Sequence, residues 1–117
     1  MLPATYDIHI YQGDTWQRWM TISIAGAPVD VSGYTLAAQV RRKHSDPEIL
    51  ATFAIDLDPQ TVGRFQLTLT PTITAALPAK DAVWDLQFTQ PDGQVFTYLH
   101  GKVAVSAEVT RPVEATP

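Results

Sequence analysis

Residues 82–105 read AVWDLQFTQPDGQVFTYLHGKVAV, and no other part of the chain indicates its fold class as clearly. Trp84, Leu86 and Phe88 alternate with polar residues, which is the period of a half-buried β-strand. Pro91-Asp92-Gly93 predicts a turn, because proline presets φ at the first central position and glycine accepts a positive φ where the next strand begins. The stretch therefore predicts a β-hairpin whose first strand carries Trp84 as a core anchor.

The returning strand of this hairpin places four aliphatic residues on one face: Val95, Leu99, Val103 and Val105. Gly101 shares that face, so the pattern predicts a β-bulge or a close backbone contact there. Phe96 and Tyr98 have the opposite parity and are expected to point away from the core. Aromatic side chains in such positions are either covered by a crossing loop or form a protein–protein interface.

Similar alternation recurs along the chain between turn residues spaced about 8–12 positions apart. Strands are predicted at 6–11, 16–24, 34–43, 48–56 and 64–70. Residues 71–77 predict a short helix that Thr70 caps and two prolines bound. We therefore expect an all-β fold, an antiparallel immunoglobulin-like β-sandwich of about seven to eight strands with one short helical crossover. A small closed barrel is the alternative.

The chain of 117 residues has the length of one domain. We expect residues 1–107 to form a single β-sandwich domain, since no internal repeat divides them. Residues 108–117 contain two prolines and no periodic pattern. They predict an extended C-terminal tail that orders only against something else.

The composition argues against several classes of protein. Eight Lys and Arg against twelve Asp and Glu give a net charge of −4, a poor match for a nucleic-acid backbone or an anionic membrane. The lack of cysteine excludes disulfide scaffolds, thiolate metal sites and cysteine nucleophiles. Neither a signal peptide nor a run of about 20 apolar residues is visible. We expect a soluble protein made inside the cell, with no nucleic-acid or membrane partner.

No motif for catalysis or metal binding stands out. His9, His44 and His100 are not spaced as metal ligands. Asp56-Leu57-Asp58 begins like a calcium loop but lacks the later glycine and glutamate. The sequence has no G-x-S-x-G elbow, P-loop or dinucleotide fingerprint. We expect no enzyme, no cofactor and no metal; an enzyme with a carboxylate pair that includes Asp85 is an alternative.

Aromatic and basic residues instead predict an interaction surface. Trp16 and Trp19 have opposite parity, so one of them faces the core and the other faces outward. Basic residues cluster at Arg41-Arg42-Lys43, as either a solvated rim or a partner-binding patch. The candidate interface residues are Trp19, Phe96, Tyr98, Arg41, Arg42, Lys43, Val109 and Arg111.

Three segments resemble small phage and prophage structural proteins. The first is YDIHIYQGDTW at 6–16, the second is VDVSGYT at 29–35 followed by QVR at 39–41, and the third comprises PDG, LHGKV and EVTR within 91–111. The chain resembles the N-terminal domain of siphophage upper baseplate proteins, which is an immunoglobulin-like β-sandwich. The likeness covers most of residues 6–111 and is carried mainly by turn chemistry and strand patterning.

The resemblance implies a virion protein that works by docking and symmetric oligomerisation, with no catalytic residue to transfer. Baseplate proteins continue into a long extension, which this sequence lacks after Pro117, so the expectation is a head decoration (cement) protein or a small tail, neck or baseplate adaptor. It would be made in the host cytoplasm and reside in the virion as a homo-oligomer, with a trimer favoured, bound to capsid or tail subunits. The alternative from another class is a carbohydrate-binding β-sandwich module that stacks Trp16 or Trp19 on a sugar ring.

Overall fold

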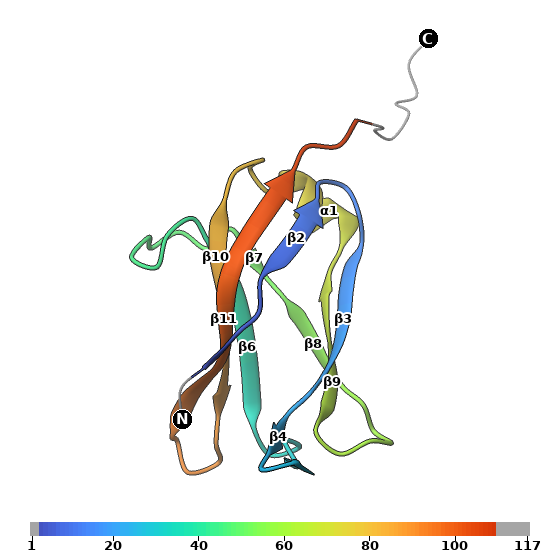
Figure 1. Ribbon diagram of the computed structural model, residues 1–117, viewed down its shortest axis with the longest axis vertical. Coiled ribbons are helices and arrows are strands. Elements are labelled where there is room, and N and C mark those ends of the chain that lie inside the picture. Colours follow the sequence, from blue (N-terminus) through green and yellow to red (C-terminus); the bar gives the residue numbers. More distant parts are fainter. Residues whose placement is uncertain (1–2, 110–117) are drawn as a thin grey trace.

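The computed structural model describes residues 3–109, and these form an all-β fold (Figure 1). The strands in chain order are β1 (Ala4–Thr5), β2 (Ile8–Tyr11), β3 (Trp16–Thr21), β4 (Ser23–Ile24), β5 (Ala27–Pro28), β6 (Thr35–Arg41), β7 (Ala51–Thr52), β8 (Ala54–Leu57), β9 (Arg64–Leu69), β10 (Ala82–Thr89) and β11 (Val95–Ser106). Between β9 and β10 these residues form a single helix, α1 (Pro71–Ala76).

The strands make two large sheets that enclose the core between them. Sheet A has six strands in the order β1-β11-β10-β6-β7, with β2 also paired to β11, and sheet B has three strands in the order β3-β9-β8. A separate short hairpin joins β4 to β5. Figure 1 shows two layers, with β6, β10 and β11 on the left and β3 and β9 on the right. The strands therefore form two separate sheets and not one closed barrel.

Two details of the expected architecture are wrong. The described residues contain eleven strands instead of seven or eight, because β1, β4, β5 and β7 are only two residues long. Sheet A is mixed and not purely antiparallel, since β1 and β2 both run parallel to β11.

The predicted first strand, 6–11, begins only at Ile8, and the two residues before it pass Gly101 outside any strand. β1 ends at Thr5 and β2 begins at Ile8, while the Tyr6 N–H between them donates to a β11 carbonyl at 2.8 Å. A Cβ atom on Gly101 would overlap the Tyr6 carbonyl, so only glycine allows this approach. The close backbone contact predicted at Gly101 is confirmed.

The core consists of the alternate residues that the sequence pattern assigns to it. Phe65, Leu67 and Leu69 of β9 are fully buried, facing sheet A. Trp84 of β10 is only 3% exposed, and its Nε1 donates to the Tyr6 carbonyl oxygen at 2.7 Å. The predicted role of Trp84 as a core anchor is confirmed, and its hydrogen bond also ties the N-terminal segment to sheet A.

The short crossover helix is confirmed as well, over Pro71–Ala76. Thr70 caps it, with Oγ1 accepting a hydrogen bond from the Ile73 N–H at 3.4 Å. Thr74 is buried and donates from its hydroxyl to the Asp14 carbonyl at 2.8 Å. This bond fixes α1 against the turn between β2 and β3, so the connection from sheet B to sheet A is anchored at its middle.

Candidate interaction surfaces

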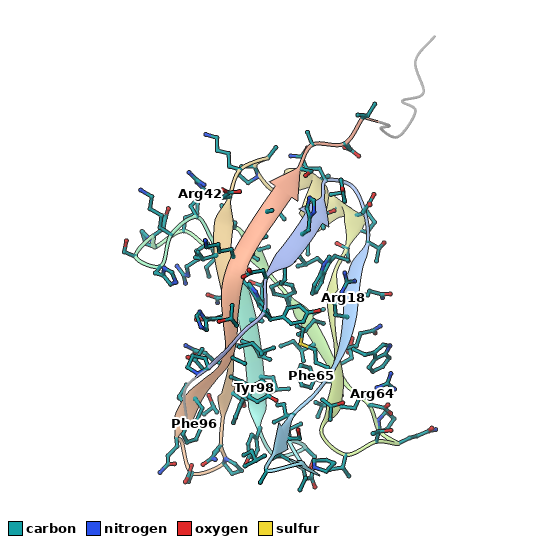
Figure 2. The ribbon with its side chains drawn as sticks, in the orientation of Figure 1. Arg18, Arg42, Arg64, Phe65, Phe96 and Tyr98 are labelled. Carbon is teal, nitrogen blue, oxygen red and sulfur yellow. The ribbon has the colours of Figure 1, made fainter. Side chains whose placement is uncertain are left out.

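Trp19 projects from the outer face of sheet B, as its parity predicts. β3 buries Trp16 and leaves Trp19 49% exposed. The Arg64 guanidinium carbon lies 4.0 Å from the centroid of the Trp19 ring, a cation–π contact. Arg64 Nη1 in turn donates to Asp58 Oδ2 at 3.0 Å; Figure 2 labels Arg64 at this face of sheet B. The three side chains form one connected group, which orients an exposed aromatic ring before any partner binds.

Asp58 is ionised at neutral pH in this group. The Gln60 backbone N–H donates to Asp58 Oδ1 at 2.9 Å and is the main reason that the pKa of Asp58 lies below its ordinary value of 3.8. The Arg64 guanidinium lowers this pKa further, while desolvation acts in the opposite direction. A carboxylate that remains charged keeps Arg64 in place over the Trp19 ring.

The expectation that Phe96 and Tyr98 point away from the core is wrong. β11 contains a β-bulge, since Leu86 of β10 pairs with Leu99 while the next β10 residue pairs with Thr97. Tyr98 is the extra residue on β11. The alternation of inward and outward side chains therefore shifts by one residue across the bulge, so that both Leu99 and Phe96 point inward, as expected when one residue is inserted into a strand.

The bulge brings both aromatic side chains onto Phe88 of the core. The ring centroids of Phe96 and Tyr98 each lie 5.8 Å from that of Phe88, and both side chains are half-buried (Figure 2). The Tyr98 hydroxyl also donates to the Thr21 carbonyl at 3.5 Å, reaching across to β3. Val95 takes the outward position instead and is 55% exposed. Phe96 and Tyr98 were predicted either to be covered within the chain or to form a protein–protein interface. In the described residues they are covered within the chain.

The two arginines at the end of β6 form hydrogen bonds with nearby loops and strands of the same chain. Arg41 donates to the Asp46 carbonyl at 2.8 Å and to Gln39 Oε1 at 3.0 Å. Arg42 donates to the Asp81 carbonyl, and Lys43 is exposed. The two arginines thus use donors within the chain, which is the geometry of a structured rim; a partner-binding role for this segment stays a prediction.

The C-terminal candidates lie at the limit of the described residues. Val109 is 94% exposed just beyond the end of β11. Arg111 lies outside the described residues, so its role in an interface stays a prediction. The Glu108 carboxylate occupies the space beside Gly13 in the turn between β2 and β3. The first residue of the expected tail therefore still contacts the domain.

Asp85 lies in a shallow pocket on the outer face of sheet A. It stands in register between His100 of β11 and Gln39 of β6, and Arg41 and His44 complete the polar lining. Burial raises the pKa of Asp85, while His44, Arg41 and His100 partly oppose that effect. Asp85 is the one carboxylate among the described residues that line this pocket, whereas a carboxylate-pair enzyme would need a second carboxylate facing it.

The sequence pattern did not predict an opening between the two sheets next to β7 and β8, which apolar side chains line. The chain changes sheets at Phe53, so that the predicted strand 48–56 becomes β7 in sheet A and β8 in sheet B. Because β7 pairs with only two residues of β6, the space between the sheets opens on this side. The opening is lined by Tyr34, Leu36, Ile55 and Leu57. Leu50 and Ala54 blur the alternation on either side of Phe53, and this loss of contrast was the one available signal.

No protein-family model matches the chain, and comparison with curated proteins found no match. No helix within residues 3–109 is long and apolar enough to cross a membrane. The same residues contain no group of three His, Asp or Glu side chains placed to hold a metal ion.

Proposed function

We propose that this chain is a non-enzymatic structural protein of a phage particle, which docks on neighbouring virion subunits and stabilises them. The observation that carries the proposal is Trp19, exposed on the outer face of sheet B and held by Arg64 and Asp58. Tryptophan and arginine are the residues most enriched among those that dominate protein–protein binding energy. Fixing their geometry in the free protein reduces the entropy lost on docking.

The proposed architecture is an immunoglobulin-like sandwich. The order β3-β9-β8 in sheet B corresponds to strands B, E and D of that fold, and β11-β10-β6-β7 in sheet A corresponds to G, F, C and C′. The first strand departs from the constant-domain pattern, because β1 and β2 pair with β11 and not with β3. This correspondence supports the resemblance to the siphophage baseplate domain, which was based on turns and strand patterning alone.

Within the particle, the protein is proposed to act as a tail, neck or baseplate adaptor or as a head decoration protein. It would assemble as a homo-oligomer, with a trimer favoured, and contact capsid or tail subunits. The net charge of −4 disfavours nucleic acid or an anionic membrane as the partner.

Immunogold electron microscopy of the parent particles with an antibody to this chain tests the proposal. Label over the head would support a decoration protein, and label confined to one tail end or the neck would support an adaptor. Absence of label from both intact and disrupted particles would overturn the assignment to a virion.

A matched pair of variants tests the part played by Trp19. Trp19→Ala should weaken docking on particles that lack the protein by about tenfold or more, the loss typical of a central interface residue. Tyr11→Ala is the control, because Tyr11 is an equally exposed aromatic residue, 51%, on the outer face of sheet A. Both variants should retain the stability of the unmodified protein. Equal docking by the two variants would contradict a role for the Trp19 surface.

A carbohydrate-binding module is the second candidate, and one observation favours it. Trp19 pairs in register with Gln66, and Gln66 with Asp56, so an aromatic ring, an amide and a carboxylate form a row across sheet B. Such a row offers a stacking surface and hydrogen-bonding groups to a sugar. Loss of glycan retention in Trp19→Ala with intact assembly would favour the module, and loss of assembly would favour the virion protein.

A further inference from the structure

The two outermost strands of sheet B differ in how their free edges are protected. Directly after β3, the Ile22 N–H donates to the Gly63 carbonyl, so alternate residues of β3 turn their N–H and C=O groups toward β9. The residues between them, Gln17 among others, face the open edge. Arg18 Nη1 donates to the Gln17 carbonyl at 2.7 Å, and the Tyr98 hydroxyl reaches the Thr21 carbonyl. Two carbonyls of the β3 edge thus already accept hydrogen bonds from side chains of the same chain, which protects the edge against pairing with a further strand.

The β8 edge has a different arrangement. The Asp58 N–H donates to the Arg64 carbonyl at 2.9 Å, which fixes the alternation along the β8–β9 ladder. Ile55 and Leu57 are the residues of β8 that turn their N–H and C=O groups away from β9. Within the described residues β8 is the last strand of sheet B, so this edge has no neighbouring strand. It offers two donors and two acceptors to an extended chain.

A cleft lined by three aliphatic side chains and a tyrosine lies directly beside this edge. Ile55 and Leu57 line one wall, Tyr34 and Leu36 line the other, and the cleft has a volume of about 130 Å³. Leu57 is 41% exposed. The side chains of Ile55 and Leu57 point toward sheet A while that of Asp56, between them, points outward. Hydrogen-bonding groups and apolar surface therefore occur together, as in sheets that accept an added strand.

We propose that β8 is the docking edge for an extended segment of a neighbouring virion protein, whose sequence there is apolar–basic–apolar. The inference rests on the proposed structural function and names the partner chemistry. The two apolar residues would pair with Ile55 and Leu57 and enter the cleft. The basic residue would lie opposite Asp56 on the outer face, where a cross-strand pair of opposite charge is stabilising. Asp30 lies close by in the adjoining loop and adds to the negative charge, whereas the charge of Asp58 is balanced by Arg64.

The charge pattern argues against a second copy of this chain as the occupant. A two-fold pairing of β8 with itself would match Ile55 with Leu57 of the other copy and use every edge group. The same register would place Asp56 directly opposite Asp56 of the other copy, and like charges in that position are destabilising. Each lysine and arginine of the chain also lacks an apolar side chain on at least one side in the sequence, so no lysine or arginine stands between two apolar residues.

NMR titration of the ¹⁵N-labelled protein tests the inference with two synthetic peptides, Thr-Val-Lys-Val-Thr and Thr-Val-Glu-Val-Thr. The lysine peptide should shift the amide signals of Ile55 and Leu57 and slow their hydrogen exchange. The glutamate peptide should bind about two- to fivefold more weakly, the range of one cross-strand charge pair. Asp56→Lys should reverse the preference between the peptides. Equal binding of both peptides, or no response at Ile55 and Leu57, would overturn the inference.

Edge-blocking variants complete the test. Leu57→Pro removes an outward N–H and one side chain of the cleft wall, while the N–H groups that bond β9 remain, and it should abolish the response at Ile55. Gln17→Pro removes an outward N–H at the β3 edge and should leave the response intact. Exchange protection at Ile55 and Leu57 that rises with protein concentration, without peptide, would identify a second copy and overturn the partner assignment. If Leu57→Pro still docks on particles while Trp19→Ala does not, the edge inference fails and the proposed function stands. Peptide binding without any label on particles would reject the virion function alone.

Discussion

The two buried tryptophans allow a matched comparison, Trp16→Phe against Trp84→Phe. Both changes replace an indole by a phenyl ring, at sites that are 5% and 3% exposed. The Trp84 Nε1 donates to the Tyr6 carbonyl at 2.7 Å, whereas the Trp16 Nε1 is buried with no acceptor among residues 3–109. The lost volume is the same in both variants, so the difference between their free energies of unfolding reports mainly on the N–H group.

The expected difference follows from the energetics of a paired and an unpaired donor. Trp84→Phe loses a hydrogen bond with a net contribution of about 0.5–1.5 kcal/mol, while Trp16→Phe removes a buried unpaired donor whose desolvation costs about 1–3 kcal/mol. Trp84→Phe should therefore lower the free energy of unfolding by about 1.5–4.5 kcal/mol more than Trp16→Phe. Urea denaturation followed by far-UV circular dichroism measures both variants, because both have the same number of tryptophans and the transition midpoint does not depend on the amplitude of the signal. Equal losses, or a larger loss for Trp16→Phe, would refute the reasoning.

Three further substitutions or deletions test other contacts. Gly101→Ala should speed hydrogen exchange of the Tyr6 N–H by about tenfold or more, because the added Cβ overlaps the Tyr6 carbonyl; unchanged exchange would disprove the close approach. Asp85→Asn should raise the melting temperature at pH 7 and lose that advantage below pH 3.8. Burial raises the folded-state pKa of Asp85 above 3.8, so its contribution to stability is complete below 3.8 and is lost as pH rises through the folded-state pKa; a pH-independent difference would contradict this. Deleting Pro112–Pro117 should leave the melting temperature nearly unchanged and weaken docking on particles, whereas unfolding would show that these residues belong to the core.

The elements that the sequence predicts well are those with an uninterrupted register. β3 and β9 pair without a break from Trp16 opposite Leu69 to Thr21 opposite Arg64. Odd-numbered and even-numbered residues therefore stay on opposite faces of sheet B along the whole of β3, and the outward position of Trp19 follows from this alternation. The contact of Trp19 with Arg64 was not predictable, because it depends on which strand lies beside β3 in sheet B.

Phe96 and Tyr98 show why the same reasoning failed on β11. The bulge at Tyr98 inserts one residue opposite β10, and the sequence of β11 alone carries no sign of it. Its physical basis lies in another strand: with the bulge, Phe96 stands opposite Phe88 and both aromatic rings pack on it. A regular β11 would expose these two rings and turn Val95 inward. Burial of two aromatic side chains in place of one valine removes far more apolar surface from water, which favours the bulged register.

The β8 edge arises from a still longer-range event, the change of sheet at Phe53. Phe53 is buried, and its N–H donates to the Ala38 carbonyl of β6, so the chain leaves sheet A at the residue that fills the core. β7 is therefore short, and β8 joins sheet B as its outermost strand. A longer β7 would cover Leu36 and close the cleft. The change of sheet at Phe53 thus both buries Phe53 and leaves Ile55 and Leu57 accessible. A variant with a longer β7 should therefore lose the docking edge of β8 while it keeps the core.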